Sequence, residues 1–245
     1  MIAGFYIAHK NYLHCMISIV IPTYNEAAII AQLVTYLQLH GRNNIAEIIV
    51  IDGGSDDTLQ IASQLGAITA KAFVKGRAAQ MNQGATMASG NILYFVHADT
   101  LPPKSFVLDI ATTINNGYEF GRYCTQFDSK SSLLKINAYF TKFDLFVCYG
   151  GDQTLFITKT LFKSIDGFNA DFKIMEDYDI TIRAKQKGNY KIIKKNVLVS
   201  ARKYEHNSWL KVQKANYIVV KMFKMGASQQ AILTKYKALL HINSY

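Results

Sequence analysis

The chain has 245 residues, of which half are hydrophobic and 18% are charged, so wholesale disorder is excluded and one large domain, with or without an appendage, is expected. The formal net charge of +10 is uneven, because residues 1–100 hold 5 basic and 6 acidic side chains while residues 101–245 hold 22 and 11. The basic part indicates either an anionic partner, such as phosphate groups, a membrane surface or nucleic acid, or a lysine-rich surface without a partner.

The cysteines and the lengths of the apolar stretches bear on whether the protein has disulfides, a zinc site or a membrane-spanning segment. Cys15, Cys124 and Cys148 form no CxxC pair, so we predict neither a disulfide framework nor a zinc site, and we expect buried thiols in a reducing cytosol. No apolar stretch approaches the roughly 20 residues that span a bilayer. Residues 1–15 lack the features of a signal peptide and precede Met16, so we expect them to be an extension outside the fold.

Strand and helix patterns alternate from Ser18 onward. Short β-rich or apolar runs predict strands, and amphipathic runs between them predict helices. Asp56 or Asp57 can cap the second helix. The predicted strands are Ser18–Ile21, Glu47–Ile51, Ile68–Val74 and Ile92–Val96, and the predicted helices are Ala27–Leu39, the run after Asp57 through Leu65, and Ala78–Met87. This order is typical of an α/β fold with a mostly parallel sheet and helices on both faces.

Polar groups follow three of these strands, at the sheet edge where such folds bind ligands. They are Thr23-Tyr24-Asn25-Glu26, Asp52-Gly53-Gly54-Ser55 and His97-Ala98-Asp99. Each stretch alone could be a tight turn. Together they offer a carboxylate and small residues for a nucleoside, and in Asp99 a ligand for the divalent cation that a diphosphate needs. Arg77 adds a basic group near the phosphates, with Gln80 and Asn82 on the same helix.

The ordered set resembles the family 2 glycosyltransferases with the GT-A fold, over roughly Met16 to Arg202. The matching stretches are Val20–Glu26, Ile48–Thr58, Gly76–Ala85, Phe95–Thr100, Gly150–Gln153, Gly167-Phe168 and Met175–Asp179. The resemblance implies a nucleotide-sugar-dependent transferase domain over residues 16–202. It also implies that a sugar passes from a UDP- or GDP-sugar to a hydroxyl acceptor, with Mg²⁺ or Mn²⁺ as cofactor.

The resemblance also implies roles for individual residues. Asp99 matches the last acidic position of the family's metal motif, and His97 stands at its first acidic position. His97 is expected either to hydrogen-bond nearby or to favour Mn²⁺ as a softer ligand. Gly53 stands where many relatives carry a second Asp, which leaves the nucleobase open. The expected nucleotide-binding residues are Pro22, Thr23, Tyr24, Asn25, Glu26, Asp52, Gly53, Gly54, Arg77, Gln80, Asn82, His97 and Ala98.

Glu176 and Asp177 match the family's acidic pair at the start of a helix. The resemblance implies an inverting reaction in which Asp177 takes the proton of the acceptor hydroxyl. The pair could also simply favour the helix dipole, and both roles can hold at once. Asp152, Gln153 and Arg202 are expected near the acceptor.

The C-terminal segment, residues 203–245, departs from the sheet pattern. Ser208–Met225 and Gln229–Leu240 predict two basic amphipathic helices. Such helices either lie on an anionic membrane or pack on the catalytic domain with solvated lysines. A lipid-linked or cell-envelope acceptor, reached from the cytoplasmic face of the plasma membrane, is the hypothesis that follows from the first alternative.

Other classes lack their motifs. A Rossmann dehydrogenase would need GxGxxG where Pro22–Glu26 stands, and a P-loop enzyme would need GxxxxGK[ST]. A sugar nucleotidyltransferase would need a Gly-rich loop with Arg and Lys after the first strand, and none is present. A nucleic-acid-binding module does not explain acidic groups at the strand ends, so no nucleic acid partner is expected. A degenerate transferase that binds a nucleotide without turnover is the remaining alternative.

Overall fold

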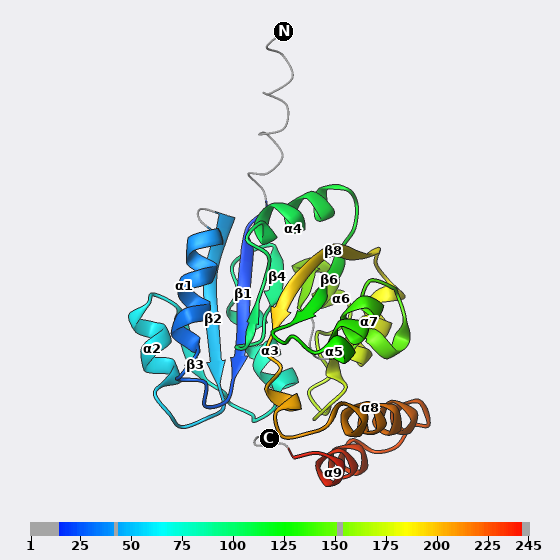
Figure 1. Cartoon of the computed structure of the whole chain (residues 1–245). Helices are drawn as coiled ribbons and strands as arrows, with labels where there is room; N and C mark the ends of the chain where they lie inside the picture. The colour runs from blue at the N-terminus through cyan, green and yellow to red at the C-terminus, as the bar shows by residue number, and fades with distance from the viewer. Residues whose placement is uncertain (1–14, 42–43, 151–153, 242–245) are drawn as a thin grey trace.

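A single sheet organises the chain, and its order places the first four strands side by side. The computed structural model describes residues 15–41, 44–150 and 154–241. Within them, eight strands pair in the order β3-β2-β1-β4-β7-β6-β8-β5 (Figure 1). They are β1 Ile17–Thr23, β2 Ile45–Asp52, β3 Ile68–Lys71, β4 Ile92–Phe95, β5 Thr100–Leu101, β6 Phe120–Phe127, β7 Leu155–Thr158 and β8 Tyr190–Val199.

Most neighbouring strands run parallel, as predicted. β1 pairs in parallel with β2 and β4, and β2 pairs in parallel with β3. In the second half of the chain β6 and β8 are parallel, whereas β7 runs antiparallel to β4 and β6, and β5 runs antiparallel to β8. The α/β class with a mostly parallel sheet is therefore confirmed, and the antiparallel insertions are additions that the pattern did not predict.

Helices cover both faces of the sheet. Side chains of α1, α2 and α4 are buried on one face, and those of α3, α6 and α7 on the other. Within β1, Ile19 and Ile21 belong to the first core and Val20 to the second, since successive side chains of a strand point to opposite faces. The helices are α1 Ile30–Gly41, α2 Thr58–Gln64, α3 Arg77–Met87, α4 Phe106–Asn115, α5 Ser132–Phe140, α6 Lys159–Ser164, α7 Glu176–Lys185, α8 Trp209–Lys224 and α9 Gln229–Leu239, with short 3₁₀ helices η3 Phe146–Cys148 and η4 Arg202–Tyr204.

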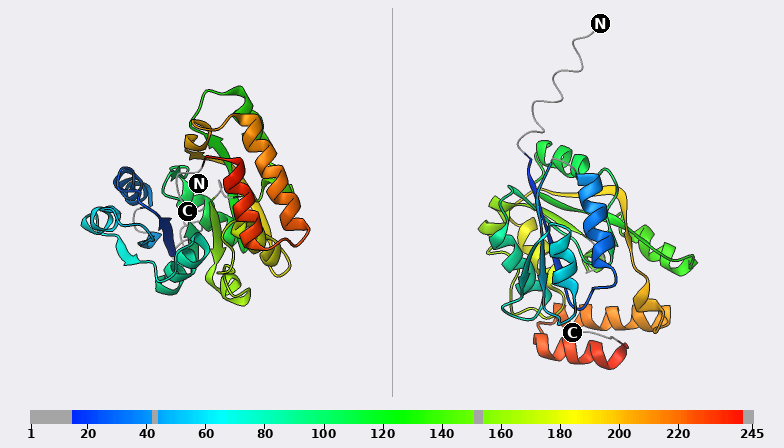
Figure 2. Two further views of the ribbon diagram at one scale, coloured as in Figure 1. Left: turned by 90° about the horizontal axis from the view of Figure 1, so that it is seen from below. Right: turned by 90° about the vertical axis from the view of Figure 1, so that its left-hand side faces the viewer.

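The two C-terminal helices turn their apolar faces toward the rest of the chain. Val219 and Val220 of α8 and Ile232 and Leu233 of α9 are buried in one cluster with Tyr178 of α7. Figure 2 shows α8 and α9 side by side, and Figure 1 places them at the end toward which the arrowheads of β1 and β2 point. Both predicted helices are present, and these four apolar residues pack on the rest of the chain.

The observed end of β3 differs from its predicted boundary. Strand β3 ends at Lys71 rather than continuing to Val74, because the Phe73 N–H bonds to Gln83 Oε1 at 3.0 Å and the chain leaves the sheet there. The expected extension, residues 1–15, lies outside the described residues except for Cys15. Among the helices that the structure describes, none is long and apolar enough to cross a bilayer.

Gln80 ties the ends of β1 and β2 together beneath the predicted ligand edge. Its side chain is 4% exposed, and Nε2 donates to the carbonyl oxygens of Thr23 at 2.7 Å and Ile51 at 2.9 Å. Both acceptors are main-chain carbonyl groups in the protein interior, where a polar group needs a hydrogen-bond partner from the protein. Gln80, which the sequence placed among the nucleotide-binding residues, thus holds the two strand ends in register with α3.

Replacing Gln80 tests this anchoring role. Gln80→Leu removes one of the donors to each of two buried carbonyl groups, so we expect the free energy of unfolding to fall by about 1–3 kcal/mol. The Thr23 carbonyl keeps the Gly53 N–H at 3.0 Å, and the Ile51 carbonyl keeps Thr23 Oγ1 at 3.4 Å. Chemical denaturation followed by circular dichroism measures the change. Gln83→Leu, on the same helix, is the matched control, since its amide bonds to the Lys71 carbonyl at a more exposed place. Equal stability of the two variants would contradict the anchoring role.

Candidate functional site

The three polar stretches do meet at one edge of the sheet. β1 lies between β2 and β4 and is parallel to both, so the residues that follow these strands emerge on the same side (Figure 1). Asn25 connects two of the stretches, because its Oδ1 accepts from the N–H of Ser55 at 2.7 Å and of Asp56 at 3.2 Å. A side chain on Gly54 would come within 2.2 Å of the same Oδ1, so this close approach requires glycine.

A second set of hydrogen bonds locks the same loops. Asp56 Oδ2 accepts from the Ala27 N–H at 3.0 Å, and its Oδ1 accepts from the Thr58 N–H at 3.1 Å. Asp56 therefore bonds the start of α2, while Asp57 stands at the N-cap without a side-chain cap bond. Burial raises the pKa of the Asp56 carboxyl, but the hydrogen bonds from Thr58 and Ala27 outweigh it, and the pKa lies below its usual value. The loop that carries Glu26 is thereby held in place.

Asp52 lies inside the protein. Its side chain is fully buried, with Oδ1 accepting from Thr23 Oγ1 at 2.9 Å and Oδ2 accepting from Lys71 Nζ at 3.2 Å. Lys71 also bonds to the carbonyl of Gly54. Lys71 was not among the predicted site residues, and its basic side chain within the predicted strand Ile68–Val74 was the signal of this role. Pro22 is likewise buried within β1, and the side chains exposed at this end include Tyr24 and Asn25.

Glu26, Asp99 and Arg202 form a charged cluster on this edge. Arg202 Nη1 and Nη2 lie 3.2 Å from the two carboxylate oxygens of Glu26, and Nη2 lies 3.2 Å from Asp99 Oδ2. Pairing of β5 with β8 brings the remote Arg202 here, since the Ser200 N–H donates to the Asp99 carbonyl at 3.2 Å. The hydrogen bonds to Glu26 raise the pKa of Arg202 above its ordinary value.

The cluster has the chemistry to accept a divalent cation with outside help. The Asp99 side chain is 29% exposed, and its carboxylate is a hard oxygen ligand of the kind that Mg²⁺ and Mn²⁺ take. The guanidinium of Arg202 shows that this pair of carboxylates already attracts positive charge. Within the described ranges no group of three or more His, Cys, Asp and Glu could hold an ion. The exposed Asp99 carboxylate fits the role of one ligand to a cation whose other ligands are phosphate oxygens and water.

The acidic pair at the start of α7 divides into an inner and an outer residue. Glu176 is 1% exposed, and its Oε1 lies 2.8 Å from Arg77 Nε, the first residue of α3. Neither Glu176 oxygen accepts an aligned hydrogen bond from the described residues, so charge attraction holds the pair. Asp177 is only partly buried. Glu176 thus connects α7 to α3, and Asp177 is the member of the pair that solvent can reach.

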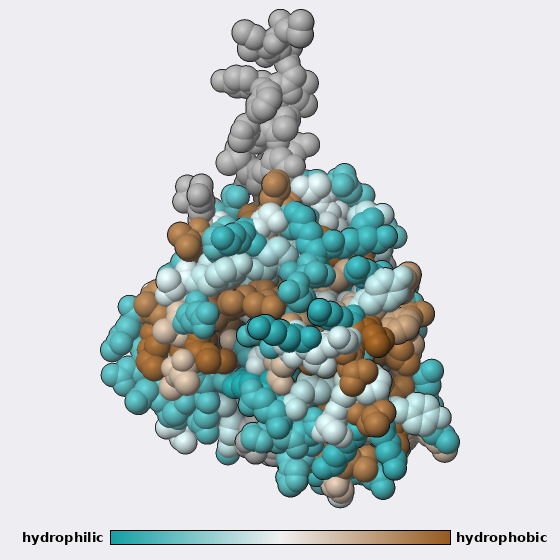
Figure 3. All heavy atoms as spheres, viewed as in Figure 1, coloured by the Kyte–Doolittle hydropathy of each residue, from teal (hydrophilic) through white to brown (hydrophobic). Residues whose placement is uncertain are grey.

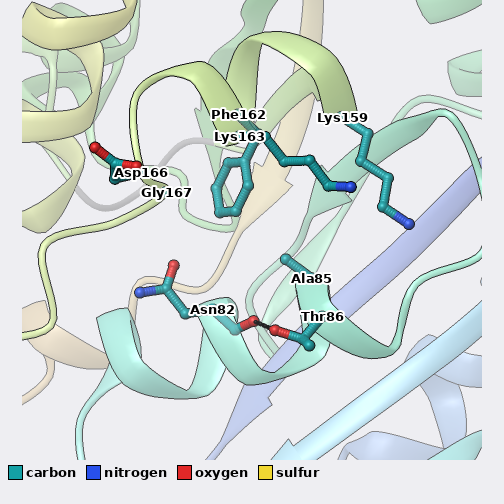
Figure 4. Close-up of a pocket in the computed structure, with 8 residues that line it drawn as sticks. All are labelled: Asn82, Ala85, Thr86, Lys159, Phe162, Lys163, Asp166 and Gly167. Atoms are coloured by element: carbon teal, nitrogen blue, oxygen red, sulfur yellow. Dashed lines mark hydrogen bonds between the residues drawn. The ribbon is translucent and has the colours of Figure 1, made fainter.

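The other predicted residues lie in different surroundings. Ala98 is buried and His97 is partly buried between Val96 and Asp99. Asp152 and Gln153 lie outside the described residues. Asn82 bonds to the backbone of Phe168, through Nδ2 at 2.7 Å and Oδ1 at 2.9 Å. It also lines an open hollow of about 470 Å³ between α3 and α6, together with Lys159, Lys163 and Asp166 (Figure 4). That hollow contains none of the strand-end residues.

Comparison with known proteins agrees with this fold. The PGL/p-HBAD biosynthesis glycosyltransferase of Mycobacterium tuberculosis is 26% identical over 192 residues, which are 69% of each chain. A crystal structure of S. aureus TarS 1–349 with UDP-GlcNAc superposes with a TM-score of 0.63 at 19% identity, over 76% of this chain. This chain spans 59% of the length of that TarS chain.

A second solved structure is similar over most of the chain. The mannosyltransferase PcManGT from Pyrobaculum calidifontis, in complex with GDP-Man and Mn²⁺, superposes with a TM-score of 0.65 at 16% identity, over 91% of this chain and 69% of its own. At such identities the likeness establishes the fold alone. The sequence model of glycosyl transferase family 2 matches residues 18–157, a stretch that contains all three strand-end loops. The chain therefore belongs to glycosyl transferase family 2.

Proposed function

We propose that the protein is a metal-dependent inverting glycosyltransferase, which moves a sugar from a nucleoside diphosphate sugar to a hydroxyl acceptor. The observation that carries the proposal is the partly exposed Asp99 carboxylate, held against Arg202 at the edge where β1, β2 and β4 end. A nucleotide diphosphate brings negative charge to a site that already has carboxylates, so a cation and a guanidinium are the groups it requires there.

The donor is proposed from the loops and from the relatives. The ends of β1 and β2 carry Tyr24, Asn25 and Gly53, beside the buried Asp52. These residues are proposed to contact the nucleoside. The S. aureus structure contains UDP-GlcNAc, and the archaeal mannosyltransferase contains GDP-Man with Mn²⁺. These complexes support a UDP- or GDP-sugar as donor and Mg²⁺ or Mn²⁺ as the ion.

The reaction is assigned to this chain's own side chains. Asp177 removes the proton of the acceptor hydroxyl, whose oxygen attacks the anomeric carbon while the nucleoside diphosphate leaves from the opposite face. A cation held by Asp99 would supply positive charge toward the leaving diphosphate. Buried Glu176, paired with Arg77, positions α7 so that Asp177 faces the acceptor side. Asp152 and Gln153 remain predicted acceptor residues.

Arg202 is assigned to the donor side of the reaction rather than to the acceptor. It contacts Glu26 and Asp99, and its side chain is half exposed, so it can reorient when an anionic ligand arrives. The acceptor is proposed to be a lipid-linked or cell-envelope hydroxyl at the cytoplasmic membrane face. The transferase unit is proposed to span residues 16–202.

Asp99→Asn tests the metal role. We expect Mn²⁺ to strengthen the binding of UDP or GDP to the native protein and to have no such effect on Asp99→Asn, with nucleotide affinity in Mn²⁺ reduced about tenfold or more. Calorimetry with each nucleotide, with and without Mn²⁺, measures this. Asp171→Asn, at an exposed loop position, is the matched control. A native, metal-dependent affinity in Asp99→Asn would refute the assignment.

Asp177→Asn separates binding from transfer. The amide cannot accept the acceptor proton, so we expect the transfer rate to fall by about 10²- to 10⁴-fold while nucleotide affinity is unchanged. Release of UDP or GDP from the cognate sugar nucleotide measures the rate. Asp179→Asn is the control on the same helix, because Asp179 pairs with Arg183 at 2.5 Å. Transfer by Asp177→Asn at the rate of Asp179→Asn would refute Asp177 as the base. Nucleotide binding by the native protein without any transfer would favour the non-catalytic alternative.

A further inference from the structure

A surface of large apolar side chains lies on α5 and the turn that follows it. Residues 132–147 are all described, and seven of their large hydrophobic side chains are between 41% and 64% exposed. These seven define the 133–147 surface: Leu133, Ile136, Tyr139, Phe140, Phe143, Leu145 and Val147. Scattered exposed leucines are ordinary on a protein, but a dense run of this kind marks an interaction surface. In Figure 3 hydrophobic side chains gather on the right-hand side, where α5 lies in Figure 1.

The surface is held firmly rather than being a loosely attached segment. Arg122, 5% exposed on β6, donates through Nη1 to the Thr141 carbonyl at 2.8 Å and through Nη2 to the Phe143 carbonyl at 3.1 Å. α5 itself buries Leu134. The turn is therefore fixed from beneath by a buried guanidinium, while the outer side chains point away from the core.

Helix α8 borders the surface at both of its ends. Trp209 Nε1, at the start of α8, donates to Asn137 Oδ1 of α5 at 3.3 Å. At the other end, Lys224 Nζ lies 4.3 Å from the ring centre of Phe146. The exposed side chains of α8 and of its C-cap residue Met225 add both apolar and basic groups beside the surface: Leu210, Lys214, Tyr217, Lys221, Lys224 and Met225.

The charges around the surface are almost all positive. Lys130, Lys135 and Lys142 are exposed on and beside α5. Two acidic residues lie near them: Asp144, which pairs with Lys185, and the exposed Asp128. Helix α8 contains four lysines and no acidic residue. Apolar side chains rimmed by lysines suit the boundary between acyl chains and anionic headgroups, where each lysine contributes about 1 kcal/mol.

We propose that the 133–147 surface docks the protein on an anionic lipid membrane. A second copy of the chain fits less well, because a symmetric contact would bring the same lysines face to face. The docking element is thus α5 and its turn, with the exposed side chains of α8. The apolar faces of α8 and α9 that the sequence suggested for this purpose are buried against the rest of the chain.

The position of the surface connects it to the candidate site. Tyr204 belongs to η4, the same short helix as Arg202, and Asn137 of α5 bonds to the Tyr204 hydroxyl at 3.3 Å. Docking would bring the edge that carries Asp99 and Arg202 next to the headgroups, where a lipid-linked hydroxyl is presented. This connection rests on the proposed function, whereas docking itself does not.

Vesicle co-sedimentation of the full chain tests the proposal. The probes are phosphatidylcholine vesicles with and without phosphatidylglycerol, at low and high salt. We expect retention on the anionic vesicles at low salt, weaker retention on neutral ones, and a loss of about tenfold or more in apparent affinity for the double variant Ile136→Glu, Phe140→Glu. Lys135→Glu, Lys142→Glu should weaken binding to the anionic vesicles alone.

The matched control is the double variant Leu39→Glu, Leu108→Glu. These leucines are 64% and 54% exposed but lie on α1 and α4, away from α5 (Figure 1), so vesicle binding should be native. Equal thermal unfolding of both double variants shows that folding is intact. Failure of the native chain to bind anionic vesicles, or equal loss in the control, overturns the proposal. A dimer in sedimentation that Ile136→Glu, Phe140→Glu abolishes, without vesicle binding, would assign the surface to a second copy.

The outcome is independent of the catalytic assignment. Native vesicle binding together with full transfer by Asp177→Asn would leave docking intact and refute the proposed reaction. Transfer to a soluble acceptor by the native protein, without vesicle binding, would refute docking and leave the proposed reaction intact.

Discussion

The parallel pairing of β1 with β2 and β4 decides where the polar groups of the candidate site lie. Parallel strands deliver their carboxyl ends to one edge, and each of these strands is followed by an acidic residue. Negative charge therefore gathers where the sheet ends. Gln80 holds two of the strand ends in register from below, and Arg202 balances Glu26 and Asp99 from above. The Arg202 contact offsets the like charges that meet at this edge, whereas the Gln80 contact satisfies main-chain acceptors.

The same charge balance links the two halves of the chain. The first half supplies carboxylates, whereas Arg202 follows β8 in the basic second half. The pairing of β8 with β5, which directly follows Asp99, is what returns the chain to Asp99. On the other side of the sheet, the ion pair between Arg77 and Glu176 joins α3 to α7 in a similar way. In both places a basic residue pairs with an acidic residue that is far away in the sequence.

In the first half of the chain, the sequence pattern predicted the strands and loops but not the partners of the polar side chains. Strands with both faces covered are apolar throughout, so β1, β2 and β4 were visible in the sequence, together with the polar loops after them. The hydrogen-bond partners of individual side chains were harder to predict from the sequence. Asp52, Gln80 and Asn82 were grouped with the ligand residues, yet each is engaged with its own protein: Asp52 with Lys71, Gln80 with two carbonyls, and Asn82 with Phe168. Periodicity indicates which face a residue occupies but not which polar partner is already there.

The sequence by itself determined the fold class, the family and the three loops, because these depend on local patterns and on motif order along the chain. Only the tertiary structure decided that Arg202 contacts Asp99, that Glu176 is buried while Asp177 is not, and that α8 and α9 pack inward. It also decided that α5 leaves its apolar side chains exposed. An amphipathic pattern states that a helix has an apolar face. Whether another segment covers that face depends on contacts between residues distant in sequence, and those contacts arise only when the sheet is assembled.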